Sequence, residues 1–249
     1  MDDFFPVMLD RPSNGQIACS TSYGIFAFSV FPFMLVLLTA DPNGIRSLAI
    51  WYDFGYHIAN FLVMLLVFCT YLKEAFWNLK LYFKNVALTV AICVVLILGY
   101  TFVMQKLSYY FRSNELLFAT YGILPLSEME LVNLSSNLVY VKPLWGSLCL
   151  VLLAPLTVSC IYYASIFAPI CCEKPVLAYI VTAFIIALPR VVAAFTLFDP
   201  AEELFLYLAQ LPVHLLCCWS YQKTDTVWTP MAILFLTNLI SCVLYLFVA

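Results

Sequence analysis

Few residues in this 249-residue chain could do chemistry, and most of them stand inside or beside long apolar runs. Ser159, Tyr162 and Tyr163 follow Pro155 in the middle of one uncharged run. A proline removes a backbone donor and kinks or unwinds a helix. Membrane proteins often place a site where polar groups follow such a break. The sequence therefore makes this segment the first candidate for a binding site.

Histidine is the commonest general base in enzymes, and the chain has only two histidines. His214 lies in an apolar stretch downstream of Glu203, where an intramembrane polar group can be functional. His57 follows Asp53 at the i, i+4 spacing that lets two side chains pair on one helix face. We favour a packing role for His214 and an interfacial pair for His57 over a catalytic role for either.

Two other charged features have structural interpretations. Glu202 and Glu203 come directly after Asp199-Pro200, an N-cap residue followed by a proline at the first helical position. Carboxylates there favour the helix dipole, so we interpret this pair as part of a helix start. Arg190 follows a proline, and it could bond freed carbonyls or extend to the membrane interface.

The composition sets the class of protein. Hydrophobic residues make up 65% of the chain and charged residues only 10%, which is typical of a polytopic membrane protein. The net charge of -3 gives no indication of a nucleic-acid partner. Most of the ten cysteines stand in apolar runs, where cysteine packs as a small hydrophobe. We therefore expect neither a disulfide framework nor a thiolate zinc site.

The apolar runs predict an all-α bundle of about seven membrane-spanning helices, with six to eight compatible. They cover residues 23–39, 54–72, 86–104, 144–172, 175–198, 204–222 and 227–248. We expect Pro189 to interrupt the fifth span and a turn at 223–226 to precede the last.

We divide the chain, as one domain, into amino-terminal transmembrane helices at 1–104, an amphipathic segment at 105–143 and a core of four helices at 144–249. The middle segment carries too many charges to span a membrane, and it could hold one or two helices lying in the interface. Lysine and arginine counts nearly balance between the two sides. The lysines of 73–84 favour a cytoplasmic amino terminus.

Four segments, in order, resemble the CPBP family of intramembrane proteases, which includes CAAX prenyl proteases and bacteriocin-processing or immunity (Abi) proteins. Ala154-Pro155-Leu156-Thr157 is similar to the sequence that precedes the family's paired glutamates. The stretch from Lys223 to Met231, with Asn238 beyond it, is similar to the family's last turn and the helix after it. The other two segments are 112–126, similar to the stretch before the catalytic core, and 177–188, at the position of the Phe-x-x-x-His motif.

The resemblance implies a protease fold from which the chemistry has been removed. The family's glutamates and histidines bind or activate water for peptide hydrolysis. Here the paired glutamates fall on Val158 and Ser159, the following arginine on Tyr163, and the two histidines on Leu188 and Leu234, while only Asn238 is retained. Replacements of these types cannot supply a general base or a strong metal ligand.

We therefore expect a non-catalytic relative of the CPBP proteases in a bacterial plasma membrane. It would act as a scaffold, regulator or immunity-type binder of a peptide or membrane-protein partner, among membrane lipids and without cofactor or metal. The cavity candidates are Ser159, Tyr162, Tyr163, His214 and Asn238. One alternative is an active endopeptidase with relocated groups, such as His214 with Glu203. Another is a small transporter subunit.

Overall fold

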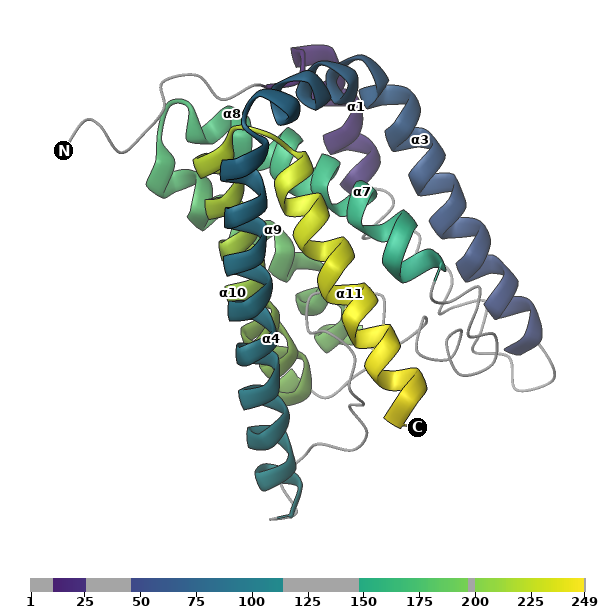
Figure 1. Ribbon diagram of the computed structural model, residues 1–249. Helices are drawn as coiled ribbons and strands as arrows, with labels where there is room; N and C mark the ends of the chain where they lie inside the picture. The colour runs from purple at the N-terminus through teal and green to yellow at the C-terminus, as the bar shows by residue number, and fades with distance from the viewer. Residues whose placement is uncertain (1–10, 26–45, 114–147, 197–199, 249) are drawn as a thin grey trace.

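The computed structural model describes residues 11–25, 46–113, 148–196 and 200–248, without the side chains at 25, 46–54, 78, 105–113, 150, 187–209 and 244–248. Every regular element in the described part is helical (Figure 1). Three stretches there are long and apolar enough to cross a membrane: Gly55–Leu81, Phe83–Met104 and Val151–Cys171. Pro175–Ile186 and Trp228–Val243 are shorter apolar helical stretches. The predicted all-α class is confirmed for these residues, whereas the predicted number of spans stays a prediction.

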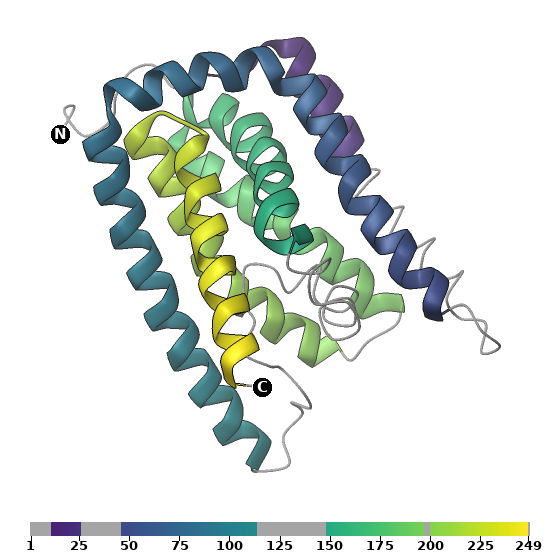
Figure 2. The ribbon, with the colours of Figure 1, turned by 45° about the vertical axis from the view of Figure 1, so that its right-hand side comes forward.

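Helices α3 (Arg46–Leu81) and α4 (Phe83–Ser113) form a bent frame that passes over one end of the other helices (Figure 2). The sequence predicted that the second span ends at residue 72 and the third at residue 104. Both helices continue past these points, because the polar residues that follow are themselves good helix formers. A loss of hydropathy marks where an apolar stretch ends and does not stop a helix. Residues 105–113 of the predicted interfacial segment thus extend α4, and 114–143 lie outside the described residues.

Three antiparallel neighbours, α9 (Pro175–Thr196), α10 (Pro200–Thr224) and α11 (Trp228–Val248), complete the described bundle. Helix α10 begins at Pro200, as the sequence predicted. The predicted interruption at Pro189 is wrong, because α9 is helical throughout. Neighbouring helices can re-satisfy the backbone group that an intramembrane proline frees, so proline need not end a helix there.

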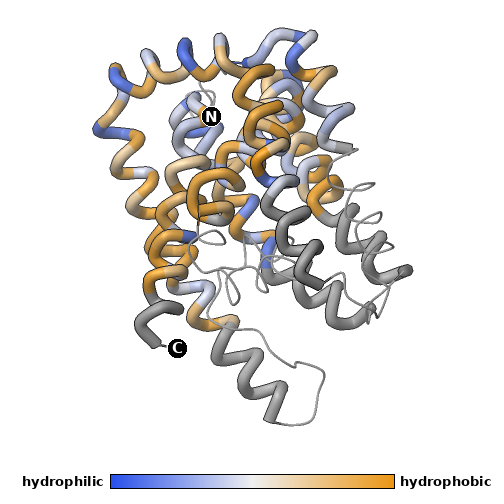
Figure 3. The backbone as a smooth tube through the Cα atoms, turned by 90° about the vertical axis from the view of Figure 1, so that its right-hand side faces the viewer, coloured by the Kyte–Doolittle hydropathy of each residue, from blue (hydrophilic) through white to orange (hydrophobic). Residues whose placement is uncertain are grey.

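The turn between α10 and α11 is hydrogen-bonded to the last turns of α3, next to the corner of the frame where α3 ends and α4 begins. Asp225 ends α10 with a left-handed φ of 54°, within the predicted turn. The Trp228 indole donates to the Leu72 carbonyl at 3.2 Å, and the Thr226 hydroxyl donates to the Ala75 carbonyl at 3.4 Å. This end of the molecule is its more hydrophilic part, while the helices that descend from it are mostly apolar (Figure 3).

A continuous central helix runs through η4 (Cys149–Leu153), α7 (Ala154–Val158), η5 (Ser159–Phe167) and α8 (Ala168–Cys171). Its π-helical parts bond five residues apart, as the Ala168 N–H does to the Tyr163 carbonyl. A proline ring clashes with the carbonyl four residues before it in an α-helix. For Pro155 and Pro169 that carbonyl belongs to Val151 and Ser165, and both lie inside a π-helical part. The break predicted at Pro155 therefore takes the form of wider turns in an unbroken helix.

Small residues bring α1 (Asn14–Ile25) close to η5. The Ser20 and Ser165 hydroxyls share a 2.5 Å hydrogen bond. One turn later, a Cβ added to Gly24 would lie 2.9 Å from Cγ2 of Ile161. Small residues four apart allow close helix packing in membrane proteins, and Ser20 and Gly24 fit that pattern. The rest of the predicted first span, beyond residue 25, lies outside the described residues.

The substitution Gly24→Leu should lower stability, because its side chain must enter the tight contact with Ile161. We expect a loss of about 1–3 kcal/mol in the free energy of unfolding, the usual cost of overpacking. Denaturant titration of the protein in detergent micelles measures this loss. Gly15→Leu is the matched control on the same helix, since a Cβ at Gly15 meets nothing within 4 Å. Equal effects of the two substitutions would show that α1 does not pack on η5 through Gly24.

Candidate functional site

The described part of the bundle holds a buried hydrogen bond between two of the predicted cavity residues. The Tyr163 hydroxyl lies 2.7 Å from His214 Nδ1, and both side chains are almost fully buried. Tyr163 comes from η5 and His214 from α10, so the bond joins the central helix to a neighbour. The Tyr162 ring meets the same imidazole edge-on at a centroid distance of 5.9 Å. The sequence predicted these residues as candidates but not that they bond to one another.

Several buried polar atoms around this bond have no hydrogen-bond partner within the described structure. They are His214 Nε2, the Ser159 hydroxyl and both polar atoms of the Gln210 side-chain amide. Gln210 and His214 are one turn apart on α10, as are Ser159 and Tyr163 on the central helix. An unsatisfied polar group is costly in an apolar interior, so each of these atoms is a place for water or for a polar atom of a ligand.

Tyr163, His214, Ser159 and Gln210 make up a buried polar cluster, and Gln210 is the member that sequence reasoning missed. It is completely buried and stands one turn before His214. An amide in an otherwise apolar helix, at i, i+4 from a histidine, is a signal that the sequence does carry. A search limited to acids and histidines passes over it, because an amide is neither a base nor a strong metal ligand.

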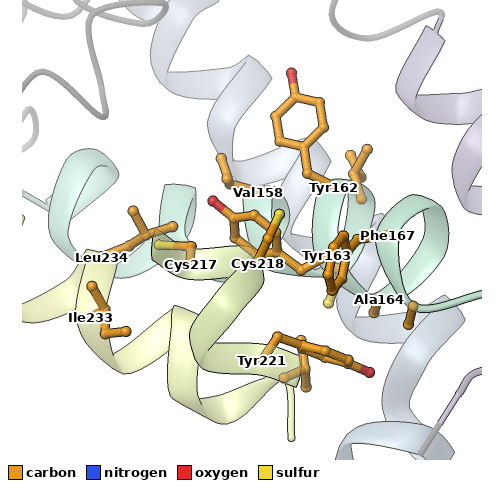
Figure 4. Packing of buried hydrophobic residues seen from close by; sticks show 14 of the residues in the cluster. Val158, Tyr162, Tyr163, Ala164, Phe167, Cys217, Cys218, Tyr221, Ile233 and Leu234 are labelled. Carbon is orange, nitrogen blue, oxygen red and sulfur yellow. The ribbon is translucent and has the colours of Figure 1, made fainter. Parts of the chain in front are cut away.

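Aromatic side chains, among them those of Tyr163, Phe167 and Tyr221, pack in the buried interior (Figure 4). Phe167 meets Tyr179 and Tyr221 edge-on at centroid distances of 5.0 and 6.3 Å. The Tyr221 hydroxyl in turn lies 2.8 Å from that of Tyr71 on α3. These contacts occupy the interior between η5, α9 and α10 with protein side chains.

The positions that the resemblance assigns to the family's acid–base groups lie in this packed interior, as far as the structure describes them. Val158 is 5% exposed and Leu234 is fully buried, in one apolar cluster with Cys217 and Cys218 (Figure 4). Asn238 is also fully buried. The side chain of Leu188 on α9 lies outside the described residues.

The other candidates are only partly covered by the structure. His57 is buried on α3 with its ring edge against Tyr56. The side chain of its predicted partner, Asp53, lies outside the description, as do those of Arg190, Glu202 and Glu203. Within the described residues, no three His, Cys, Asp or Glu side chains gather in one place. The absence of a bound metal stays a prediction. Most described cysteines are buried, which confirms that they pack as small hydrophobes.

A separate apolar groove of about 460 Å³ lies between the frame, the central helix and α11. The side chains that line it are those of Leu79, Phe83, Val86, Ala87, Val90, Val151, Leu152, Pro155, Leu156, Trp228, Met231, Ala232 and Phe235. None of the predicted cavity residues lines this groove. Pro155, where the sequence predicted a break in the central helix, forms part of its wall.

No protein-family model, curated protein or solved structure matches this chain.

The Tyr163–His214 bond should appear as an energetic coupling. Tyr163→Phe and His214→Leu should each lower the unfolding free energy by about 1–3 kcal/mol, because each leaves a buried polar atom without its partner. The double variant should lose less than the sum, by about 0.5–3 kcal/mol. Denaturant titrations of the four proteins in micelles measure the coupling.

Tyr179→Phe combined with His214→Leu is the control pair. Tyr179 donates to Gln222 and not to the histidine, so these two losses should add. Additive losses for Tyr163 and His214 as well would contradict the bond.

Proposed function

We propose that this chain is a non-catalytic, integral membrane relative of the CPBP proteases that works by binding a peptide or membrane-protein partner as a scaffold, regulator or immunity-type protein. The observation that supports this most is the packing at Val158 and Leu234. Side chains that neither take up protons nor bind metals are buried there among apolar neighbours. Hydrolysis would need a general base and a stabilised oxyanion at such positions.

The membrane setting is part of the proposal. The three long apolar helical stretches, together with α9, α10, α11 and the predicted span at 23–39, make up the seven spans. The corner of the frame, the α8–α9 turn and the α10–α11 turn lie at one end of the molecule (Figures 1 and 2). That end carries Lys73, Lys80, Lys84, Lys174 and Lys223. Lysine-rich ends face the cytoplasm, so we place this end and the amino terminus on the cytoplasmic side of a bacterial plasma membrane.

A relocated active site is the second candidate, and the buried imidazole is the observation that favours it. His214 Nδ1 is held by Tyr163, and Nε2 has no partner in the described structure. With Nδ1–H donating to the Tyr163 oxygen, the lone pair of Nε2 is uncommitted, which is the form that a general base requires. Glu203, the acid that the sequence offers for it, has its side chain outside the described residues.

The substitution His214→Asn separates the two functions. Asparagine can present either the oxygen or the nitrogen of its side-chain amide to the Tyr163 hydroxyl, but it has no acid–base chemistry near neutral pH. A binding protein should keep its biological effect in the variant, measured by complementation of a deletion strain. A peptidase that uses His214 should lose about 10²–10⁴-fold in rate.

Peptide cleavage gives the direct measurement. The purified chain in lipid nanodiscs is incubated with prenylated carboxyl-terminal peptides and secreted-peptide precursors, and the products are followed by mass spectrometry. We expect no product above that formed in empty nanodiscs. Cleavage by the native chain that disappears in His214→Asn, with unchanged thermal stability, would establish the peptidase instead. The control substitution Ser159→Ala removes an unpartnered hydroxyl and should leave complementation intact.

A further inference from the structure

We propose that the apolar groove between α4, the central helix and α11 binds one acyl chain of an anionic phospholipid, whose phosphate lies at Lys80 and Lys84. The inference rests on the position of the groove, on its lining and on the charges at one end of it, and it does not depend on the proposed relation to proteases.

In the membrane setting proposed above, the groove lies at the depth of the apolar helical stretches and starts at the membrane surface. Its walls are the apolar stretches Phe83–Met104, Val151–Cys171 and Trp228–Val243. It begins at the corner between α3 and α4 and follows α4 as far as Val90. At 1.5 Å per residue, the stretch from Phe83 to Val90 is ~10 Å long. The groove is therefore directed from the corner between α3 and α4 toward the middle of the bundle.

The lining selects an acyl chain rather than a polar ligand. Aliphatic and aromatic side chains line the groove, with small residues, Ala87 and Ala232, on facing helices. Within a bilayer, burial of apolar surface does not by itself drive association, because lipid tails are as apolar as leucine. An open apolar groove of this kind is filled by the apolar group already present at that depth. That group is an acyl chain of the surrounding lipid.

The charge at the mouth of the groove selects the lipid headgroup. Lys80 and Lys84 are exposed and stand next in sequence to the groove residues Leu79 and Phe83. The stretch 73–84 has three lysines against Glu74 as its one acid. Basic residues at a membrane surface attract anionic lipids. A phospholipid whose chain occupies the groove would have its phosphate at this level.

Aromatic contacts hold one of these lysines beside the groove. Lys80 Nζ lies 4.4 Å from the ring centroid of Trp77 and 5.1 Å from that of Phe76. The Phe76 ring meets the groove residue Trp228 edge-on at 5.8 Å. Ammonium–ring contacts and interfacial aromatic residues are both typical of the headgroup level. The ammonium is thus positioned at the mouth rather than left free in solution.

Photo-crosslinking tests the proposal with the full chain. The protein is placed in phosphatidylcholine nanodiscs that contain a small fraction of phosphatidylglycerol with a diazirine in its acyl chain. Labelled peptides are located by mass spectrometry. The comparison probe is phosphatidylcholine with the same diazirine chain. We expect the phosphatidylglycerol probe to label the α4 and α11 residues of the groove more than tenfold above the comparison probe. Each of the two lysines should increase the binding of an anionic lipid by about five-fold.

Four variants separate groove binding from general lipid contact. Ala87→Phe should abolish groove labelling by filling the groove, whereas Ala91→Phe, on an exposed part of α4 outside the groove, should not. Changing Lys80 and Lys84 together to Gln should remove the preference for phosphatidylglycerol. The same change at Lys174 and Lys223, at the same end of the molecule, should leave it. Gel filtration and thermal unfolding check that each variant is folded. If Ala87→Phe does not fold, the lysine variants still test the proposal, because the lysines that they change are exposed.

Three outcomes would overturn the proposal. Equal labelling by the two probes would mean that the groove holds bulk lipid without selection by charge. Labelling spread evenly over the exposed faces of α3, α4 and α9 would mean that no chain is held in the groove. Cross-links from the groove to a second copy of the chain, or to another protein that co-purifies with it, would identify a protein occupant instead.

Discussion

The structure depends on a helix that is surrounded by other helices. In Val151–Cys171, a stretch long and apolar enough to cross a membrane, 89% of the described window is buried, compared with 33% for Gly55–Leu81 and 39% for Phe83–Met104. A helix in this position has to meet neighbours on every side, and its backbone has to satisfy its own hydrogen bonds in an apolar medium. The π-helical parts meet both requirements. In these parts the backbone groups still bond within the helix, five residues apart, and the wider turns leave room for the proline rings. The Ser165 hydroxyl also donates to the Cys160 carbonyl five residues earlier.

The neighbours of this helix are joined to it by two different kinds of contact. Helix α1 approaches through small residues and one serine pair, which allows backbones to come close. Helices α9 and α10 approach through large rings and polar contacts, of which the Tyr163–His214 bond is the most buried. The polar cluster of Tyr163, His214, Gln210 and Ser159 lies in the interior, on the side where α10 packs on the central helix. The groove lies elsewhere, between α4 and α11. A polar interior and an apolar groove are thus separate features of one bundle, and they suit different ligands.

The frame made by α3 and α4 passes over the end of the bundle that we propose lies at the membrane surface. Its corner is fastened by backbone carbonyls of α3, which accept from the indole of Trp228 and the hydroxyl of Thr226. Lysine and tryptophan side chains, which are typical of a membrane interface, occur at the same corner. The same corner forms the mouth of the groove. A movement of α11 relative to the frame would therefore change the corner bonds and the groove together.

The sequence by itself determined the helical class, the apolar character of the spans, the start of α10 at Pro200 and the turn before α11. Each follows from local chemistry: hydropathy at the scale of one span, the missing N–H of proline, and a chain reversal in a short polar segment. It also singled out Ser159, Tyr162, Tyr163 and His214, because polar groups are rare in apolar runs. The wrong expectation, an interruption at Pro189, arose because a single residue was taken to decide where a helix ends. The predicted limit of a span at residue 72 marks a loss of hydropathy, and α3 itself continues to Leu81.

Only the tertiary structure decided which of these residues meet. Tyr163 and His214 are 51 residues apart, and no local pattern specifies that their side chains bond. The complete burial of Gln210 and the position of the groove likewise depend on how helices distant in sequence pack. Burial, hydrogen-bond partners and cavities are properties of pairs of helices. Sequence patterns report on one helix at a time, and for that reason the elements could be predicted while the site could not.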